Sequence, residues 1–234
     1  MLLGKLREAV LEANLELVRR GLVISTFGNA SRVARDEGLI VIKPSGVHYK
    51  QMKPEHLVVT DLFGKVVEGT LRPSSDLPTH AALYRAFPTI GGVAHTHSEY
   101  ATAWAQARQP IPCFGTTHAD SFHGPIPLTE AMSDEEISGD YEANTGAAII
   151  RAFGKIDPLA VPAVLVANHG PFAWGADPAK AAENAWMLEA VARVAYFTVN
   201  INPHAGSIGK TLHDRHFLRK HGLTAYYGQA RKKE

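Results

Sequence analysis

The sequence has 234 residues, of which 45% are hydrophobic and 20% are charged, enough to bury the core of a globular domain without disulfides. The formal net charge of +1 excludes a chain-wide attraction to nucleic acid or to acidic lipid, so any anion-binding site must be local. A single cysteine, Cys113, excludes an internal disulfide and a cysteine-rich zinc module. Any metal ligands must therefore be histidines and carboxylates.

The residues at the start of the sequence lead us to expect no export. Charged residues interrupt every short apolar run in residues 1–11. No apolar stretch in the sequence approaches the roughly 20 residues that a membrane-spanning helix needs. We therefore expect a cytoplasmic protein that binds neither membrane nor nucleic acid.

The first third of the chain predicts one helix followed by a set of strands. Residues 3–21 carry apolar residues at helical spacing and end at a glycine. Short runs rich in β-branched residues predict strands at 39–42, 57–60 and 65–68. The turns between these strands are too short for crossover helices, so we expect neighbouring strands to pair antiparallel.

The rest of the chain alternates helices and strands. We expect helices at 79–87, 100–107, 135–153, 178–196 and 210–221, and strands at 91–97, 163–167 and 172–174. No repeat, low-complexity tract or linker divides the sequence. The predicted fold is α/β: a single domain over residues 1–234, an α/β/α three-layer sandwich with a largely antiparallel central sheet.

Three of the 12 histidines predict a metal site. His95 and His97 are two residues apart on a predicted strand, so both imidazoles should project from one face. His169 follows a predicted buried strand and precedes a glycine, and Asp76 offers a further oxygen ligand. Taken alone, a His-x-His pair is more often two surface residues on a half-exposed strand.

Three segments rich in glycine and hydroxyl residues predict a phosphate site. They are Thr26-Phe-Gly-Asn29 with Ser31, Lys43-Pro-Ser-Gly46 and Pro73-Ser-Ser-Asp76. Backbone amides at glycine turns, hydroxyl donors and a lysine suit a phosphate monoester. Each segment alone could be an ordinary turn, because glycine, serine, asparagine and proline dominate turns.

A polar run without periodicity, residues 115–123, could deliver a proton-transfer group. Asp120 is the natural candidate, since carboxylates act as acid or base when burial or a cation sets their pKa. His118 and His123 in the same run could simply lie on the surface. Tyr226 and Tyr227 near the C-terminus are more typical of core or lid aromatics, but a phenol near a cation can donate a proton.

These motifs resemble the class II aldolase and adducin-head family, and within it the branch that epimerises pentulose phosphates at C4. The resemblance covers essentially the whole chain. It rests on the segments already quoted and on Leu11-Glu-Ala-Asn-Leu15, Gly115-Thr-Thr-His-Ala-Asp120, His169-Gly-Pro-Phe-Ala-Trp-Gly175, Leu218-Arg-Lys-His-Gly222 and Tyr226-Tyr-Gly-Gln229.

The resemblance implies a set of site residues. It places a divalent cation, Zn²⁺ or another first-row ion such as Mn²⁺ or Co²⁺, on His95, His97 and His169, with Asp76 on or close to the metal. In the related fuculose-phosphate aldolases the position of Asp76 carries a glutamate base, so the shorter aspartate favours the epimerase branch. Phosphate binding is implied for Gly28, Asn29, Lys43, Ser45, Gly46, Ser74 and Ser75, and proton transfer for Asp120 and Tyr227.

The implied reaction interconverts L-ribulose 5-phosphate and D-xylulose 5-phosphate, as in arabinose catabolism. The C3–C4 bond breaks, the aldehyde fragment rotates while its phosphate stays anchored, and the bond re-forms on the opposite face. Inversion requires a proton-transfer group on each face, and Asp120 and Tyr227 would be these two. The family assembles as homotetramers with sites at subunit interfaces, so a neighbouring chain is expected to supply both residues.

Three alternatives remain open at this point. An aldolase of the fuculose-phosphate type would break the same bond but release the fragments. A close paralogue in ascorbate or other pentose breakdown would use the same substrate pair. A non-catalytic adducin-like module would share the fold, although such modules have lost the metal ligands that stand here.

Overall fold

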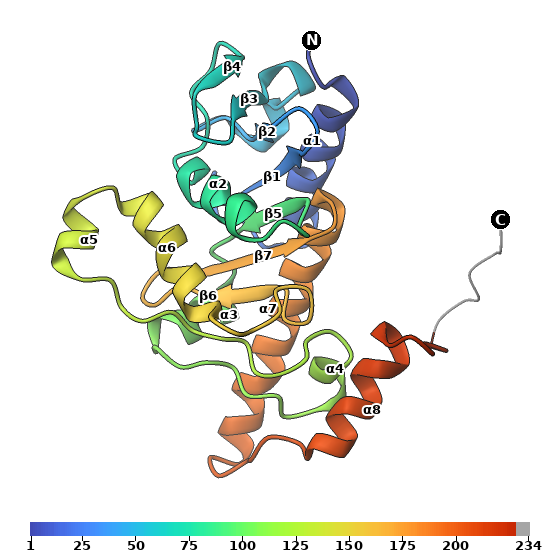
Figure 1. Cartoon of the computed structure of the whole chain (residues 1–234). Helices are drawn as coiled ribbons and strands as arrows, with labels where there is room; N and C mark the ends of the chain where they lie inside the picture. The colour runs from blue at the N-terminus through green and yellow to red at the C-terminus, as the bar shows by residue number, and fades with distance from the viewer. Residues whose placement is uncertain (228–234) are drawn as a thin grey trace.

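The computed structural model describes residues 1–227, and Figure 1 shows a sheet with helices packed on both sides. Within these residues the sheet has seven strands in the order β4-β3-β2-β1-β5-β7-β6, and every neighbouring pair is antiparallel. The strands are β1 (Asn29–Ala34), β2 (Leu39–Ile42), β3 (Val58–Asp61), β4 (Val66–Glu68), β5 (Gly92–His95), β6 (Ala163–Leu165) and β7 (Pro171–Gly175). The predicted antiparallel sheet is confirmed.

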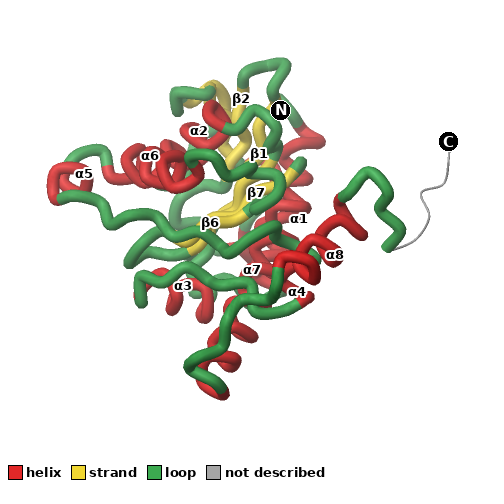
Figure 2. Tube along the Cα trace, turned by 60° about the horizontal axis from the view of Figure 1, so that its bottom comes forward, coloured by secondary structure: helices red, strands yellow, loops and turns green. Residues whose placement is uncertain are grey.

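The helices enclose the sheet from two sides, as the view in Figure 2 also shows. They are α1 (Gly4–Arg19), α2 (Leu77–Ala86), α3 (Glu99–Gln106), α4 (Thr116–Ala119), α5 (Asp134–Ser138), α6 (Tyr141–Phe153), α7 (Pro178–Ile201) and α8 (Lys210–His221). Two short 3-10 helices lie at Tyr49–Gln51 and Pro54–His56. No helix among the described residues is both long and apolar enough to cross a membrane.

The two faces of the sheet carry side chains of different size. On the face covered by α1, α3 and α7, strands β1, β5 and β7 present Ala30, Ala94 and Ala173. On the face covered by α2 and α6 the same region of the sheet presents larger residues, including Phe172 and Trp174. Alternate side chains of a strand point to opposite faces, so one set of strands supplies both cores. The predicted three-layer α/β/α sandwich is therefore confirmed.

The prediction of one helix over 135–153 was wrong, because α5 ends at Ser138 and a second helix, α6, begins at Tyr141 within that range. Ser133 begins α5 with a capping box, in which its hydroxyl accepts from Glu136 N and Glu136 accepts from Ser133 N. The helix ends at Gly139, and Asp140 begins α6 by accepting from Ala143 N. The break places Tyr141 and Glu142 in the first turn of a new helix.

The sequence patterns also missed β1 and α4, and the strand expected at 91–97 ends early. Strand β5 stops at His95, because its neighbour β7 begins at Pro171, which accepts from Thr96 N but has no N–H to donate in return. Ser98 then begins α3. Consequently His97 lies on the connection after the strand rather than within it.

Candidate metal centre and phosphate pocket

Three histidines converge at one edge of the sheet. His95 ends β5, His97 lies on the connection that follows, and His169 lies in the turn between β6 and β7. One ligand nitrogen from each ring lies within 4.8 Å of the other two. The three rings are inclined to one another by 61° to 73°. Rings that are inclined and converge in this way can direct their lone pairs at one ion, so this site could hold a divalent metal.

The turn that carries His169 is built to approach the strand closely. Asn168 adopts a left-handed conformation with φ of 60°, which asparagine tolerates better than most residues. A Cβ at Gly170 would lie 3.0 Å from the carbonyl oxygen of Thr96. Glycine at this position therefore lets His169 reach the other two histidines.

Neighbouring groups orient two of these imidazoles. Nδ1 of His95 lies 2.9 Å from the carbonyl oxygen of Pro171, so it donates there and leaves the Nε2 lone pair free. The Tyr141 hydroxyl lies 3.4 Å from Nδ1 of His169. Burial, followed by the proximity of His95 and His97, lowers the pKa of His169 to about 4. Burial is also the main cause that lowers the pKa of His97. The neutral form of His97 and His169, which a metal requires, is therefore favoured.

Asp76 lies beside the three histidines at the start of α2. Its Oδ2 accepts a 2.6 Å hydrogen bond from Nδ2 of Asn29 on β1. Burial by itself raises the pKa of this carboxyl, but His95, His80 and the Asn29 hydrogen bond outweigh it and hold the pKa below its usual value. Asp76 is thus ionised and lines the same cavity as the three histidines.

The three predicted phosphate-type turns line one cavity with the histidines and Asp76. The cavity has a volume of about 360 Å³. Its lining includes every residue for which the resemblance implies phosphate binding: Gly28, Asn29, Lys43, Ser45, Gly46, Ser74 and Ser75. Ser31, which the sequence grouped with the first turn, does not line the cavity. Tertiary folding therefore brings together turns that are up to 47 residues apart, as the Asn29–Asp76 contact illustrates.

Gly28 and Lys43 show how the cavity wall is held. Gly28 has φ of 105°, its carbonyl oxygen accepts a 2.6 Å hydrogen bond from the Tyr49 hydroxyl, and a Cβ here would lie 3.1 Å from the His95 carbonyl oxygen. Lys43 is buried, and its ammonium lies 4.8 Å from the centre of the Tyr49 ring. Burial lowers the pKa of Lys43, and the Asp76 carboxylate opposes this shift. An anionic ligand would supply a further counter-charge for this ammonium.

Sequence reasoning missed Tyr141 and Glu142, which both line the cavity. They form the first turn of α6. The pair Gly139-Asp140, a helix stop followed by a capping residue, indicates a new helix start. The prediction of one long helix over 135–153 overlooked it. Phe27, between two assigned residues, also lines the cavity and lies 5.8 Å from the His97 ring, centre to centre.

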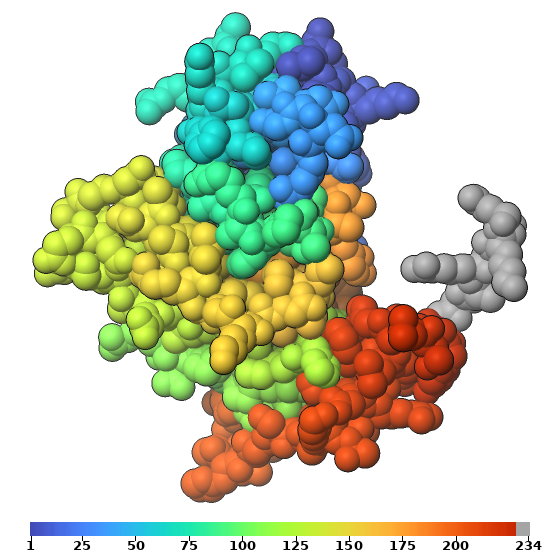
Figure 3. All heavy atoms as spheres, viewed as in Figure 1, coloured from blue at the N-terminus to red at the C-terminus, as the bar shows by residue number. Residues whose placement is uncertain are grey.

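Asp120 and Tyr227 do not line this cavity within one chain. Asp120 follows α4 and is bound by α8: Arg219 donates to both its carboxylate oxygens, and His216 lies 3.1 Å from Oδ1. Tyr227 is exposed, with its ring 4.4 Å from the Arg219 guanidinium carbon. Figure 3 shows α8 as the red edge of the molecule. The structure thus places both Asp120 and Tyr227 against Arg219, outside the cavity that His95, His97 and His169 line. Gly228 and Gln229 of the C-terminal motif lie outside the described residues.

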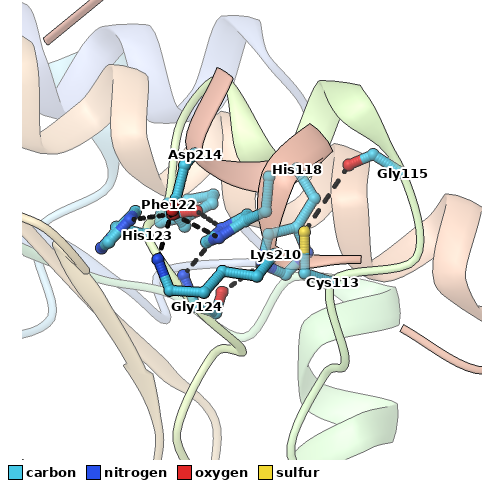
Figure 4. Close-up of polar contacts among 9 residues, drawn as sticks. Cys113, Gly115, His118, Phe122, His123, Gly124, Lys210 and Asp214 are labelled. Carbon is cyan, nitrogen blue, oxygen red and sulfur yellow. Dashed lines mark hydrogen bonds and ion pairs between the residues drawn. The ribbon is translucent and has the colours of Figure 1, made fainter. Parts of the chain in front are cut away.

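A second group of possible metal ligands, shown in Figure 4, joins α8 to the segment after α4. His123 lies 3.1 Å from Asp214 Oδ1, and Asp214 also pairs with Lys210. The rings of His123 and His213 are stacked at 15°, unlike the inclined rings of the first site. Stacked rings do not aim their lone pairs at a common point. We therefore interpret this group as a polar contact that holds α8 in place.

The chain is similar to known proteins over most of its length. The family model described as Class II Aldolase and Adducin N-terminal domain matches residues 8–196. L-ribulose-5-phosphate 4-epimerase UlaF of Salmonella paratyphi B is 55% identical over 225 residues, covering 96% of this chain and 99% of its own. The protein of the same name from Salmonella typhi matches equally well.

Solved structures confirm the fold. An L-fuculose 1-phosphate aldolase superimposes with a TM-score of 0.77 at 25% identity, covering 91% of this chain and 94% of its own. The L-fuculose 1-phosphate aldolase of Glaciozyma antarctica, at 19% identity, gives a TM-score of 0.74 over 92% of this chain and 80% of its own. The chain therefore belongs to the class II aldolase and adducin family.

Proposed function

We propose that the chain is an L-ribulose-5-phosphate 4-epimerase, a metal-dependent isomerase that interconverts L-ribulose 5-phosphate and D-xylulose 5-phosphate. The observation that carries the proposal is one cavity lined both by three converging histidines and by three phosphate-type turns. The identity of 55% to curated 4-epimerases over 96% of the chain supports the substrate. The fuculose-phosphate aldolases enter only as more distant relatives of the same fold.

The residues divide the work by their chemistry. Lys43, the hydroxyl residues and the backbone amides of the glycine turns would hold the phosphate, which keeps the aldehyde fragment in place while it rotates. When bound to the histidines, a divalent cation supplies a Lewis acid next to the ketone. Asp76, hydrogen-bonded by Asn29, would complete the ligand set. One of Asp120 and Tyr227 would accept the C4 hydroxyl proton as the C3–C4 bond breaks, and the other would donate its own proton to the aldehyde oxygen as the bond re-forms on the opposite face.

This division requires two chains, because Asp120 and Tyr227 lie apart from the cavity of their own chain. We propose a homotetramer in which α4 and α8 of one subunit complete the site of the next. Mixing two inactive variants tests it: His97→Asn lacks a ligand and Asp120→Asn lacks a proton carrier. Shared sites predict that the mixture regains activity after subunit exchange, whereas an inactive mixture of exchanged tetramers would contradict the shared site.

Incubation with L-ribulose 5-phosphate tests the reaction. We expect D-xylulose 5-phosphate to accumulate to an equilibrium mixture. Release of glycolaldehyde phosphate without D-xylulose 5-phosphate would instead identify an aldolase and remove the epimerase proposal. A phosphorylated pentulose is charged and is retained inside cells. We therefore also propose that the enzyme is cytoplasmic and serves pentose breakdown, such as arabinose catabolism.

Zinc is the metal that we propose. Histidine nitrogens suit Zn²⁺, and three protein nitrogens leave coordination positions for a substrate. Mn²⁺ and Co²⁺ are the alternatives, since imidazole accepts several first-row ions. Metal analysis of protein purified without chelator tests this, and the ion that restores activity to stripped protein should match the one found.

A further inference from the structure

A line of polar side chains crosses the apolar layer between α2 and the sheet and ends at the metal centre. Asp76, His80 and Tyr84 are four residues apart, so they share one face of α2. Asn29 and Ser31 are two residues apart on β1, so both side chains point to the face of the sheet that α2 covers. Hydrocarbon surrounds this line, including Val33, Leu83, Val93 and Phe172. Polar groups in such a layer need a specific reason to be there.

Ser31 is the centre of the line. Its Oγ lies 2.7 Å from Nδ1 of His80 and 2.8 Å from the Tyr84 hydroxyl oxygen. Ser31, His80 and Tyr84 are each fully buried. Burial raises the pKa of the Tyr84 phenol, so its O–H remains available as a donor. Burial lowers the pKa of His80 to about 3, so its ring carries a single proton at neutral pH.

Within the described part of the chain, the second ring nitrogen of His80, Nε2, lacks the hydrogen-bond partner that a buried polar atom normally has. Among residues 1–227, Nε2 of His80 is buried and has no hydrogen-bond partner. A buried polar atom without a partner costs about 1–3 kcal/mol. Helical side chains lean toward the N-terminus of their helix, so the His80 ring lies over the turn that begins at Asp76.

The direction of the hydrogen bonds decides what Nε2 offers. If Tyr84 donates to Ser31 and Ser31 donates to Nδ1, the single proton of the His80 ring is on Nε2. The reverse order would leave a lone pair on Nε2, and the nearby ionised carboxylate of Asp76 makes this arrangement electrostatically less favourable. The first order places on Nε2 an N–H donor that is unpartnered among the described residues and lies near this carboxylate.

We propose that His80 is a positioning residue for Asp76, with Tyr84 and Ser31 holding its proton on Nε2 so that Nε2–H donates to the Asp76 carboxylate when metal is bound. Asn29 already donates to Oδ2, so the carboxylate would have two donors that fix its orientation toward the metal. This inference rests on the metal site of the proposed function, but it concerns metal binding and is measured without turnover.

Two substitutions at His80 separate its two nitrogens. His80→Asn keeps a polar group near Nδ1, facing Ser31, but cannot reach Asp76, whereas His80→Gln extends an amide nitrogen to the position of Nε2. Stripped protein is titrated with Co²⁺ against a competing chelator, and the visible absorption of bound Co²⁺ reports its ligand geometry. We expect His80→Asn to bind Co²⁺ roughly 10–100-fold more weakly with an altered spectrum. The glutamine variant should recover most of this affinity.

A double-mutant cycle tests the route through Asp76. In an Asp76→Asn background, the further change His80→Asn should have little additional effect on Co²⁺ affinity. An equal loss in both backgrounds, or wild-type affinity and spectrum in His80→Asn, would overturn the proposal. If the His80 variants fail to fold by circular dichroism, Tyr84→Phe carries the test, because it removes only the first hydroxyl. We expect it to weaken Co²⁺ binding severalfold, and unchanged binding would then overturn the proposal.

This experiment also distinguishes the two proposals. Protein that shows the His80 dependence of Co²⁺ binding but no epimerase activity would refute the proposed function and retain the positioning role. Active protein whose Co²⁺ affinity does not depend on His80 would refute the positioning role and retain the proposed function.

Discussion

Arg219 of α8 binds Asp120 through two parallel hydrogen bonds, from Nε to Oδ1 at 3.0 Å and from Nη2 to Oδ2 at 2.7 Å. The same guanidinium lies 4.4 Å from the centre of the Tyr227 ring. A bidentate arginine fixes both the charge and the plane of a carboxylate. The two proposed proton carriers therefore depend on one side chain.

Asp120→Asn should abolish most turnover while sparing the metal. An amide cannot exchange a proton at neutral pH, and losing a general acid or base typically costs about 10²–10⁴-fold in rate. Steady-state kinetics and metal analysis of the same sample measure both properties. Asp134→Asn, on the remote helix α5, is the matched control and should remain active. Full activity in the Asp120 variant would remove this residue from the mechanism.

Arg219→Met should shift the acidic limb of the pH profile. Burial raises the pKa of Asp120, but hydrogen bonds from Arg219 and His216 outweigh it and hold the pKa below its usual value. Removing the guanidinium raises that pKa, so the carboxylate becomes protonated at a higher pH as the solution is acidified. We expect kcat/KM to decline at higher pH than in the wild type.

Arg215→Met provides the comparison for this shift, because Arg215 lies one turn away on α8 and contacts Tyr226 instead. Its profile should superimpose on that of the wild type. An unshifted profile for Arg219→Met would argue that ionisation of Asp120 does not limit the reaction.

His97→Asn should lower metal content and activity together. His97 is one of three nitrogens within 4.8 Å of one another, so its loss leaves an incomplete ligand set. Metal content per chain and kcat are measured on the same preparation. His204→Asn replaces an exposed histidine outside the site and should change neither. Normal metal content in the His97 variant would show that His97 is not a metal ligand.

Lys43→Met should raise KM for L-ribulose 5-phosphate more than it lowers kcat. The buried ammonium lines the cavity with the phosphate-type turns, and a charge-assisted hydrogen bond is worth about 1.5–3 kcal/mol, or roughly 10–100-fold in binding. Lys50→Met, at an exposed position on the following 3-10 helix, should leave KM unchanged. A KM equal to that of the wild type would place the phosphate elsewhere.

Acid should destabilise the protein through His118. Its Nε2 lies 2.8 Å from the Gly124 carbonyl oxygen, and burial lowers its pKa to about 4. The folded-state pKa lies below the unfolded value, so the unfolded chain binds more protons between about pH 6.5 and 4. Stability is therefore fully present above this window and is lost as the pH falls through it, by up to about 3 kcal/mol.

Urea unfolding at several pH values measures this contribution. His118→Gln should unfold more easily at pH 7 but lose less stability on acidification, because the group that titrates has gone. His204→Gln should keep the wild-type slope. If the slope is unchanged in His118→Gln, other groups account for the acid sensitivity.

Local patterns were sufficient for much of the fold. The β-branched runs at 39–42 and 57–60 predicted strands, and the short turns between them predicted antiparallel pairing, as observed. Strand β1 escaped because Asn29-Ala-Ser-Arg-Val-Ala34 lacks an alternating apolar pattern. Its inward side chains Asn29 and Ser31 are polar because they face Asp76 and His80. Hydrophobic periodicity cannot reveal a strand that packs against polar partners.

The sequence by itself determined which chemistry the chain carries. The pair His95 and His97, the later His169 and the glycine–hydroxyl turns are visible as residue types at short spacings. They are readable because each motif is local: a strand end or turn sets the direction of its own side chains.

Only the tertiary structure decided which motifs share a cavity and which do not. It joined Asn29 to Asp76 across 47 residues, brought Tyr141 to His169, and bound Asp120 to α8 instead of to the histidines. It also buried His80 against Ser31 beneath α2. The physical reason is that such contacts depend on how strands and helices far apart in the chain pack together, and no local spacing encodes that arrangement.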